Sequence, residues 1–166
     1  MPATLTATST ILTRLLLPEN DRHSLIVLLD ERLADTADPD SHVSPAHRNV
    51  KDLNFSQLHE LFDQLAAEAF PRFDLIAERA CALGGLAMET VRMATERWNV
   101  PESPGKTADG QSHLRAFLDR SQFTANIRNA IDVADKQHGR STADLFTQNS
   151  RTADKQLWFT EAHVQS

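Results

Sequence analysis

Two pairs of residues near the middle of the chain have types and spacings that could bind a metal ion. His59 and Asp63 stand four positions apart, and so do Asp74 and Glu78. On an α-helix, residues four positions apart project from the same face. Two carboxylates placed there repel each other, which disfavours the helix unless something compensates. Imidazole and carboxylate ligands together suit Fe(II) and other divalent ions.

Both pairs fall in one long helical pattern. It predicts a helix from about Phe55 to Leu83, ended by Gly84 and Gly85. On a helical wheel with His59 at zero, the other three candidates fall between about 40° and 100°. The apolar residues cluster between about 200° and 320° on the same wheel. The four candidates therefore share a stripe that faces away from the predicted core, and a solvated polar face is the alternative interpretation of that stripe.

His59 and Glu78 are too far apart to bind one ion within a single chain, because about 28 Å of helix separates them. A second, antiparallel copy could pack on this stripe around a twofold axis near Glu68. His59 of one copy would then meet Asp74 and Glu78 of the other. The Glu-x-x-His signature of di-iron bundles is absent from the sequence. The sequence therefore predicts that a metal site would lie between chains.

Helical periodicity predicts four long helices, with a shorter one in the connection between the second and the third. The four long helices are expected over about Asn20–Thr36, Phe55–Leu83, residue 110 to near Gly139, and Thr142–His163. Asp109 is expected to cap the third of these and Ser141 the fourth. The short helix is expected over about Met88–Trp98. Residues 1–19 are expected to be a flexible tail and residues 20–166 a single domain. Four amphipathic helices with a long crossover predict an all-α four-helix bundle. Cys81 and Trp158 are expected in its interior.

Composition and charge exclude several classes of function. The chain has 166 residues, 40% hydrophobic and 24% charged, which is ordinary for a globular protein. A single cysteine rules out an internal disulfide framework, and no apolar run is long enough to span a membrane. The formal charge of −6 opposes binding to the phosphate backbone of DNA. We expect a cytoplasmic protein.

Four segments resemble the Dps (DNA protection during starvation) miniferritins of the ferritin-like superfamily. They are HRNVKDLNFSQLHELFDQL, FDLIAERACALGG, ETVRMATERWNVPE and TADLFTQNSRTADKQLWFTEAH, within residues 20–165. The resemblance implies a hollow homododecamer of ferritin-like bundles, built from twofold dimers with two ferroxidase centres at each interface. Such proteins oxidise Fe(II), preferably with hydrogen peroxide rather than oxygen. They store the ferric iron inside the shell, which protects against oxidative stress.

The resemblance also implies roles for five residues at the metal centre. His47 and His59 of one subunit would bind iron together with Asp74 and Glu78 of its mate. Asp63 would bind a second iron or orient His47 as a hydrogen-bond partner. The implied cofactor and substrate is iron, as Fe(II) before oxidation and Fe(III) after it.

Three further acidic residues match functional positions of the family. Glu60 would face the cavity and help to nucleate mineral, whereas Asp135 and Asp144 match residues that line the threefold iron pores. As ordinary residues near helix ends, Asp135 and Asp144 need no such role. A dodecamer would multiply the charge of −6 twelvefold, and the chain has no basic tail. Direct DNA binding is therefore not expected, and charge does not support association with the nucleoid. The remaining histidines are expected at the surface: His23, His42, His113, His138 and His163.

The sequence departs from the family pattern at three places. Pro39 and Pro45 fall where the family has an unbroken first helix, so we expect a break and a restart just before His47. Arg48 replaces a tryptophan and puts a fixed positive charge beside the proposed cation site. Pro71 lies inside the second helix, between the two ligand pairs. Two interpretations stay open: an active ferroxidase, or a structural or DNA-associated shell with an impaired metal centre.

Overall fold

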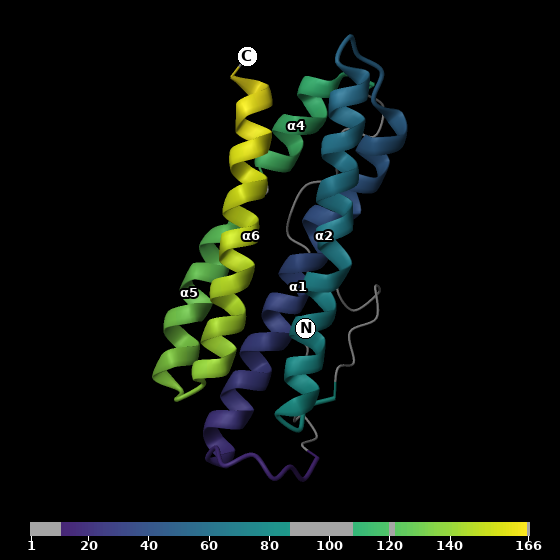
Figure 1. Ribbon diagram of the computed structural model, residues 1–166. Coiled ribbons are helices and arrows are strands. Elements are labelled where there is room, and N and C mark those ends of the chain that lie inside the picture. The colour runs from purple at the N-terminus through teal and green to yellow at the C-terminus, as the bar shows by residue number, and fades with distance from the viewer. Residues whose placement is uncertain (1–10, 87–107, 120–121, 166) are drawn as a thin grey trace, which may run out of the picture.

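The computed structural model describes residues 11–86, 108–119 and 122–165. Within these ranges, residues 37–41 and 122–123 are described by their backbone alone. The described helices are α1 (Glu19–Asn49), α2 (Phe55–Ala82), α4 (Gly110–Leu118), α5 (Gln122–Lys136) and α6 (Arg140–Val164). α4 and α5 follow one another along α6, so together they fill the place of a single helix in the bundle (Figure 1). This arrangement confirms the predicted all-α four-helix bundle. The short helix predicted over residues 88–98 lies outside the described residues.

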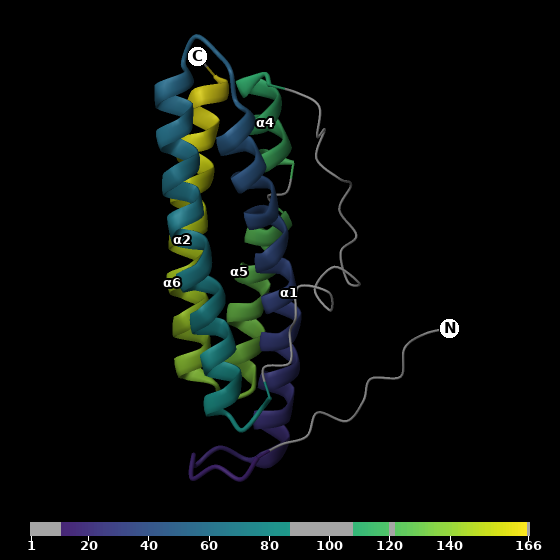
Figure 2. The ribbon, with the colours of Figure 1, turned by 90° about the vertical axis from the view of Figure 1, so that its right-hand side faces the viewer.

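α1 is one continuous helix of 31 residues, so the predicted break at Pro39 and Pro45 is wrong. Each proline removes a backbone hydrogen bond and costs about 3 kcal/mol in a helix interior. Packing offsets that cost, because Val43 and Ala46 are buried in the core at this end of the bundle. α1 also packs along α2 over most of its length (Figure 2). The unbroken helix carries His47 in its last turn.

The third predicted helix is divided into two. Asp109 caps its start as expected, because the Asp109 side chain accepts a hydrogen bond from the backbone N–H of Ser112 at 2.8 Å. However, α4 ends at Leu118 and α5 begins at Gln122. No glycine or proline stands between these residues, so the sequence carried no breaker signal at the division.

The turn between α5 and α6 differs from the predicted one, because Gly139 rather than Ser141 is the N-terminal cap of α6. A Cβ at Gly139 would stand 2.7 and 2.8 Å from two side-chain carbons of Leu25 on α1, so the backbone approaches α1 where no side chain fits. His138, just before it, has a left-handed φ of 57°. Close packing on α1 therefore sets the reversal, and the predicted cap at Ser141 is wrong.

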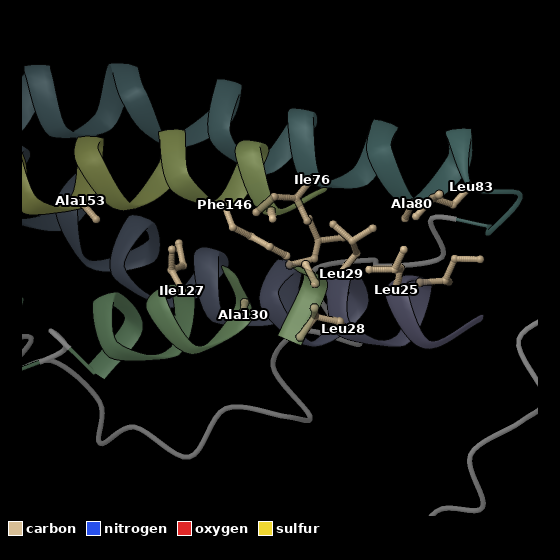
Figure 3. Packing of buried hydrophobic residues seen from close by; sticks show 14 residues of the cluster. Leu25, Leu28, Leu29, Ile76, Ala80, Leu83, Ile127, Ala130, Phe146 and Ala153 are labelled. Carbon is tan, nitrogen blue, oxygen red and sulfur yellow. The ribbon is translucent and has the colours of Figure 1, made fainter. Parts of the chain in front are cut away.

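Two hydrophobic clusters fill the bundle. The first joins α1, α2, α5 and α6, and Figure 3 shows its side chains pointing toward one another. Its largest fully buried members are Leu25, Ile26, Leu29, Leu33, Ile76, Leu83, Ile127 and Phe146. The second cluster joins the end of α1, the start of α2 and α4, and comprises Val43, Ala46, Val50, Leu58, Leu61, Phe62, Leu65 and Leu114. The helix ends that carry His47 and His59 are thus held together by a core of their own.

Polar side chains join α2 to α6. The buried Arg72 donates a hydrogen bond to Oε1 of Gln156 at 3.0 Å, and Nε2 of Gln156 donates to Oε2 of Glu68 at 3.1 Å. Farther along, Nε of Arg79 donates to Oγ1 of Thr142 at 3.0 Å, and burial lowers the pKa of the Arg79 guanidinium. These contacts fix the rotation of α2 against α6, and hence the face of α2 that stays exposed.

Three side chains lie elsewhere than predicted. Trp158 and Cys81 are exposed rather than interior, whereas His113 is buried rather than at the surface. Cys81 falls at about 40° on the wheel that has His59 at zero, so it belongs to the exposed stripe of α2. Helical periodicity shows which residues share a face of a helix. The presence of a small or aromatic side chain on a face does not show whether that face packs against another helix.

The described part of the predicted tail, residues 11–18, lies against the end of α2. The N–H of Ile11 donates to the carbonyl oxygen of Gly84 at 2.6 Å, and Leu17 packs against the first cluster. The division into a tail of residues 1–19 and a domain of residues 20–166 stays a prediction. Within the described parts of the chain, no helix is long and apolar enough to cross a membrane.

Candidate metal centre

The junction of α1 and α2 brings three of the predicted ligands together. His47 stands in the last turn of α1, and His59 and Asp63 stand on successive turns of α2. One ligand atom from each of these residues lies within 4.8 Å of the others. Atoms bonded to one metal ion at about 2.1 Å lie up to about 4.2 Å apart. Only a small movement therefore separates this group from a metal-binding geometry.

Contacts within the group orient the two imidazole rings. The rings of His47 and His59 stack, with centroids 3.7 Å apart and planes inclined by 29°. Nε2 of His47 lies 2.8 Å from Oδ1 of Asp63. Nδ1 of His59 lies 3.2 Å from the backbone carbonyl oxygen of His47. Because a carbonyl only accepts, Nδ1 of His59 carries the proton and Nε2 keeps its lone pair for a metal ion.

The group opens to solvent on one side. The side chain of His47 is 25% exposed, and that of Asp63 is 63% exposed. A half-open site with three protein ligands leaves coordination positions free for water, an oxidant or side chains of another chain. The two histidines with one carboxylate match the ligand set that non-haem Fe(II) sites commonly use.

The connection between α1 and α2 is held in place by its own hydrogen bonds and by the chain at and just before the start of α4. The N–H of Lys51 donates to the carbonyl oxygen of Ala108 at 2.8 Å, and the N–H of Asn54 donates to Oδ1 of Asp52 at 3.2 Å. Gly110 approaches so closely that a Cβ there would overlap the Leu58 side chain on α2. The start of α4 therefore supports the two helix ends that carry the ligands.

Asp109 fixes the start of α4 electrostatically. The hydroxyl and the backbone N–H of Ser112 donate to Oδ2 of Asp109 at 2.6 and 2.8 Å. These hydrogen bonds favour the ionised carboxylate and hold the pKa of Asp109 below its ordinary value. The negative charge also suits the positive end of the helix dipole.

Asp74 and Glu78 lie farther along α2 and stand outside this group. Both are exposed on α2. Between the two sets of ligands α2 also exposes Ala67 and Phe70, and Phe70 is 72% exposed. The structure thus gathers His47, His59 and Asp63 within one chain, while the pairing of Asp74 and Glu78 with a second chain stays a prediction.

The other acidic candidates are exposed, and Glu60 lies far along the chain from Asp135 and Asp144. Glu60 follows His59 on α2, Asp135 lies near the end of α5, and Asp144 lies near the start of α6. Asp135 and Asp144 therefore flank the α5–α6 turn, at the end of α5 away from α4 (Figure 1). Their roles in mineral nucleation and iron passage stay predictions.

The sequence analysis missed Phe55 as part of the site. Its ring centroid lies 5.1 Å from that of His59, with the planes inclined by 30°. The spacing of four residues was a usable signal, because it places both rings on one face of α2. We had interpreted Phe55 only as the first residue of the helix.

Comparison with known proteins places the chain in a class. A model of the ferritin family, described as a ferritin-like domain, matches residues 28–166. The solved structure of DpsC from Streptomyces coelicolor is similar with a TM-score of 0.89 and 26% sequence identity, over 97% of this chain and 95% of that one. A Dps protein from Bacillus brevis gives a TM-score of 0.81 at 26% identity, over 89% of this chain and 99% of that one. The protein is therefore a ferritin-like helical bundle.

Sequence relatives define the family within that class. The DNA protection during starvation protein of Agrobacterium fabrum (strain C58 / ATCC 33970) is 38% identical over 150 residues, which are 90% of this chain and 93% of the relative. A protein of the same name from Brevibacillus brevis is 29% identical over 72% of this chain and 80% of its own length. The chain belongs to the DNA protection during starvation (Dps) family, as the resemblance predicted.

Proposed function

We propose that the protein binds and oxidises Fe(II), preferably with hydrogen peroxide, and stores the ferric iron in a hollow homododecamer. The observation that carries the proposal is the group formed by His47, His59 and Asp63, whose ligand atoms lie within 4.8 Å of one another. It is the only group of three or more metal-ligating side chains with this spacing among the described residues. Membership of the Dps family supports the same assignment.

The ligand set is completed by a second copy of the chain. A twofold axis between positions 68 and 69 makes two antiparallel α2 helices pair residues at equal distances from the axis. His59 then faces Glu78 of the second copy, and Asp63 faces Asp74. Asp63 and Asp74 are both exposed in the single chain. Two carboxylates that meet across an interface repel each other unless a cation lies between them, so this pairing favours a metal ion.

The same register gives the interface an apolar centre. Phe70 faces Ala67 of the second copy, and by symmetry Ala67 faces Phe70. A large exposed ring opposite a small side chain fits close helix packing, and burying it contributes about 1.5–3 kcal/mol. Phe70 is exposed in the single chain, and the twofold contact would remove its ring from water.

The chemistry follows from the ligands. Oxygen-rich sites with few imidazoles favour Fe(III) over Fe(II), which favours oxidation. One hydrogen peroxide molecule accepts an electron from each of two Fe(II) ions and, with two protons, yields two water molecules and two Fe(III) ions. The reaction consumes both reagents that would otherwise form hydroxyl radicals, which is how such a centre protects against oxidative stress.

The other assignments belong to the same proposal. Glu60 helps to nucleate the ferric mineral, and Asp135 with Asp144 lines the pores through which iron enters, where acidic side chains concentrate cations. The protein acts in the cytoplasm, as one domain over residues 20–166 behind a tail of residues 1–19. The charge of −6 for each chain argues against direct DNA binding.

One observation favours a second candidate function, an iron-poor structural shell. Arg48 is exposed in the last turn of α1, directly after His47. A fixed positive charge next to a cation site weakens cation binding. In that case the cage would assemble without fast oxidation.

Anaerobic iron oxidation separates the two candidates. Fe(II) is added to iron-free protein without oxygen, peroxide follows, and ferric absorbance is recorded for the parent, His59→Ala and Glu19→Gln. Glu19 is an exposed carboxylate at the opposite end of α1 and serves as the control. We expect fast oxidation by the parent and the control, and oxidation near the buffer rate by His59→Ala in an intact cage. A parent cage that oxidises no faster than buffer would overturn the proposal and favour the shell.

A further inference from the structure

Phe55 lies in an exposed position that core packing does not explain. It is the first residue of α2, its side chain is 45% exposed, and it belongs to neither hydrophobic cluster. The structure instead places its ring 5.1 Å from the His59 ring, at an inclination of 30°. Among the described residues, the rings of Phe55 and His47 are the two aromatic rings that pack on His59.

The hydrogen bond to His59 leaves part of its orientation free. Nδ1 of His59 donates to the His47 carbonyl oxygen over 3.2 Å, which is at the long end for such a bond. One long hydrogen bond fixes the tautomer and one edge of the ring, but it constrains the ring plane only weakly. Aromatic rings packed within about 4.5–7 Å supply that missing constraint, because offset stacking restricts tilting of both partners.

Metal binding increases the benefit of this contact. An imidazole that binds a divalent ion takes on positive character, and the face of a phenylalanine ring is negative. Phe55 thus stabilises the metal-bound form of His59 more than the free form. A ring held in place beforehand also loses less conformational entropy when the ion binds.

We propose that Phe55 is a positioning residue of the metal centre, which holds the His59 imidazole plane so that Nε2 points toward the metal ion. The proposal rests on the proposed function, because it needs a metal ion bound at His59. Phe55 contributes no ligand atom, so its effect on the metal ion passes through His59. Its loss therefore weakens binding and distorts the coordination geometry, while the ligands themselves remain.

Co²⁺ binding to the assembled protein tests the proposal without oxidation, because the visible absorption of Co²⁺ reports its coordination geometry. Three substitutions separate the ring from its bulk: Phe55→Ala, Phe55→Leu and Phe55→Trp. Leu53→Ala is the matched control, since Leu53 is a fully exposed apolar residue two positions away. Size-exclusion chromatography with light scattering checks assembly, and Fe(II) oxidation kinetics give the half-saturation concentration separately from the maximal rate.

We expect Phe55→Ala and Phe55→Leu to bind Co²⁺ roughly three- to tenfold more weakly than the parent, with an altered visible spectrum. Phe55→Trp should restore both, and Leu53→Ala should match the parent. If Phe55→Ala does not assemble, Phe55→Leu decides, because it keeps the apolar bulk. Parent-like affinity and spectrum for an assembled Phe55→Leu would overturn the role of the ring. A parent that binds no Co²⁺ through His59 would instead overturn the proposed function itself.

Discussion

Centres shared between two chains predict that two inactive variants restore each other. His59→Ala removes a histidine ligand from its own chain, and Asp74→Ala removes the carboxylate that its chain gives to a partner. In a dimer with one chain of each kind, one centre lacks both residues. The other centre receives His59 from the Asp74→Ala chain and Asp74 from the His59→Ala chain, so it is intact.

The size of the recovery follows from the symmetry. Random pairing of equal amounts makes about half of all dimers mixed, and each mixed dimer has one intact centre out of two. About one quarter of all centres are then intact. The mixture should therefore oxidise Fe(II) at roughly a quarter of the parental rate, whereas each pure variant stays near the buffer rate.

The assay uses co-expressed variants with different affinity tags, so that only mixed cages survive two purification steps. Native mass spectrometry gives their composition, and peroxide-driven ferric absorbance gives the rate. His59→Ala co-expressed with Asp63→Ala is the matched control. In each centre, His59 and Asp63 come from the same chain. Every centre in a mixed dimer therefore lacks one of the two, and none is intact. Mixed cages of His59→Ala with Asp74→Ala that stay as inactive as the control would refute the shared centre.

Three further predictions concern assembly and stability. Phe70→Asp removes a side chain whose burial at the proposed interface contributes about 1.5–3 kcal/mol on each of two chains. The cage should therefore dissociate into smaller species in native mass spectrometry, and an unchanged cage would place the interface elsewhere. Gly139→Ala puts a Cβ 2.7 Å from a carbon of Leu25 and should lower the free energy of unfolding, measured by urea denaturation, by roughly 1–3 kcal/mol. An unchanged free energy of unfolding would mean that the Leu25 side chain moves aside without cost. The pKa of Asp109 is lowered in the folded chain from 3.8, so its ionised form stabilises the fold above that pH, and the contribution is lost as the pH falls through the folded value. Thermal unfolding should find Asp109→Asn less stable than the parent at neutral pH, with a difference that shrinks below pH 3.8; a difference that grows there would contradict the assignment.

Local patterns predicted the helices where sequence signals and packing agree. Asp109 caps its helix and Gly84 follows the end of α2, as the local capping and stop signals indicated. α1 was mispredicted because the cost of an interior proline is local, whereas the burial of Val43 and Ala46 that offsets it comes from contacts with distant residues. The division near Leu118 carries no breaker residue, so periodicity could not reveal it.

The candidate metal centre was predictable in its ligand types, whereas most of its contacts were not. Spacing on α2 put His59 beside Asp63, while the approach of His47 depended on a continuous α1 that the sequence analysis did not expect. The stacking of Phe55 on His59 follows from the same spacing of four residues, but an aromatic residue at a helix start has many other uses. The proposed partners of Asp74 belong to a second chain, so contacts within one chain do not include them.

The continuous α1 changes what the departures from the family pattern imply. A break with a restart just before His47 would have put that ligand on a separate helical segment, whereas the continuous α1 carries it to 2.8 Å from Asp63. Consecutive helix residues point about 100° apart, so Arg48 projects away from the direction of His47. Arg48 is exposed, and a unit charge 4 Å from a divalent ion in water interacts with it by about 2 kcal/mol, less at greater distance and in salt. The guanidinium therefore weakens binding of a divalent cation by a factor of about 30 or less, which slows a ferroxidase centre at low iron concentration without preventing its assembly.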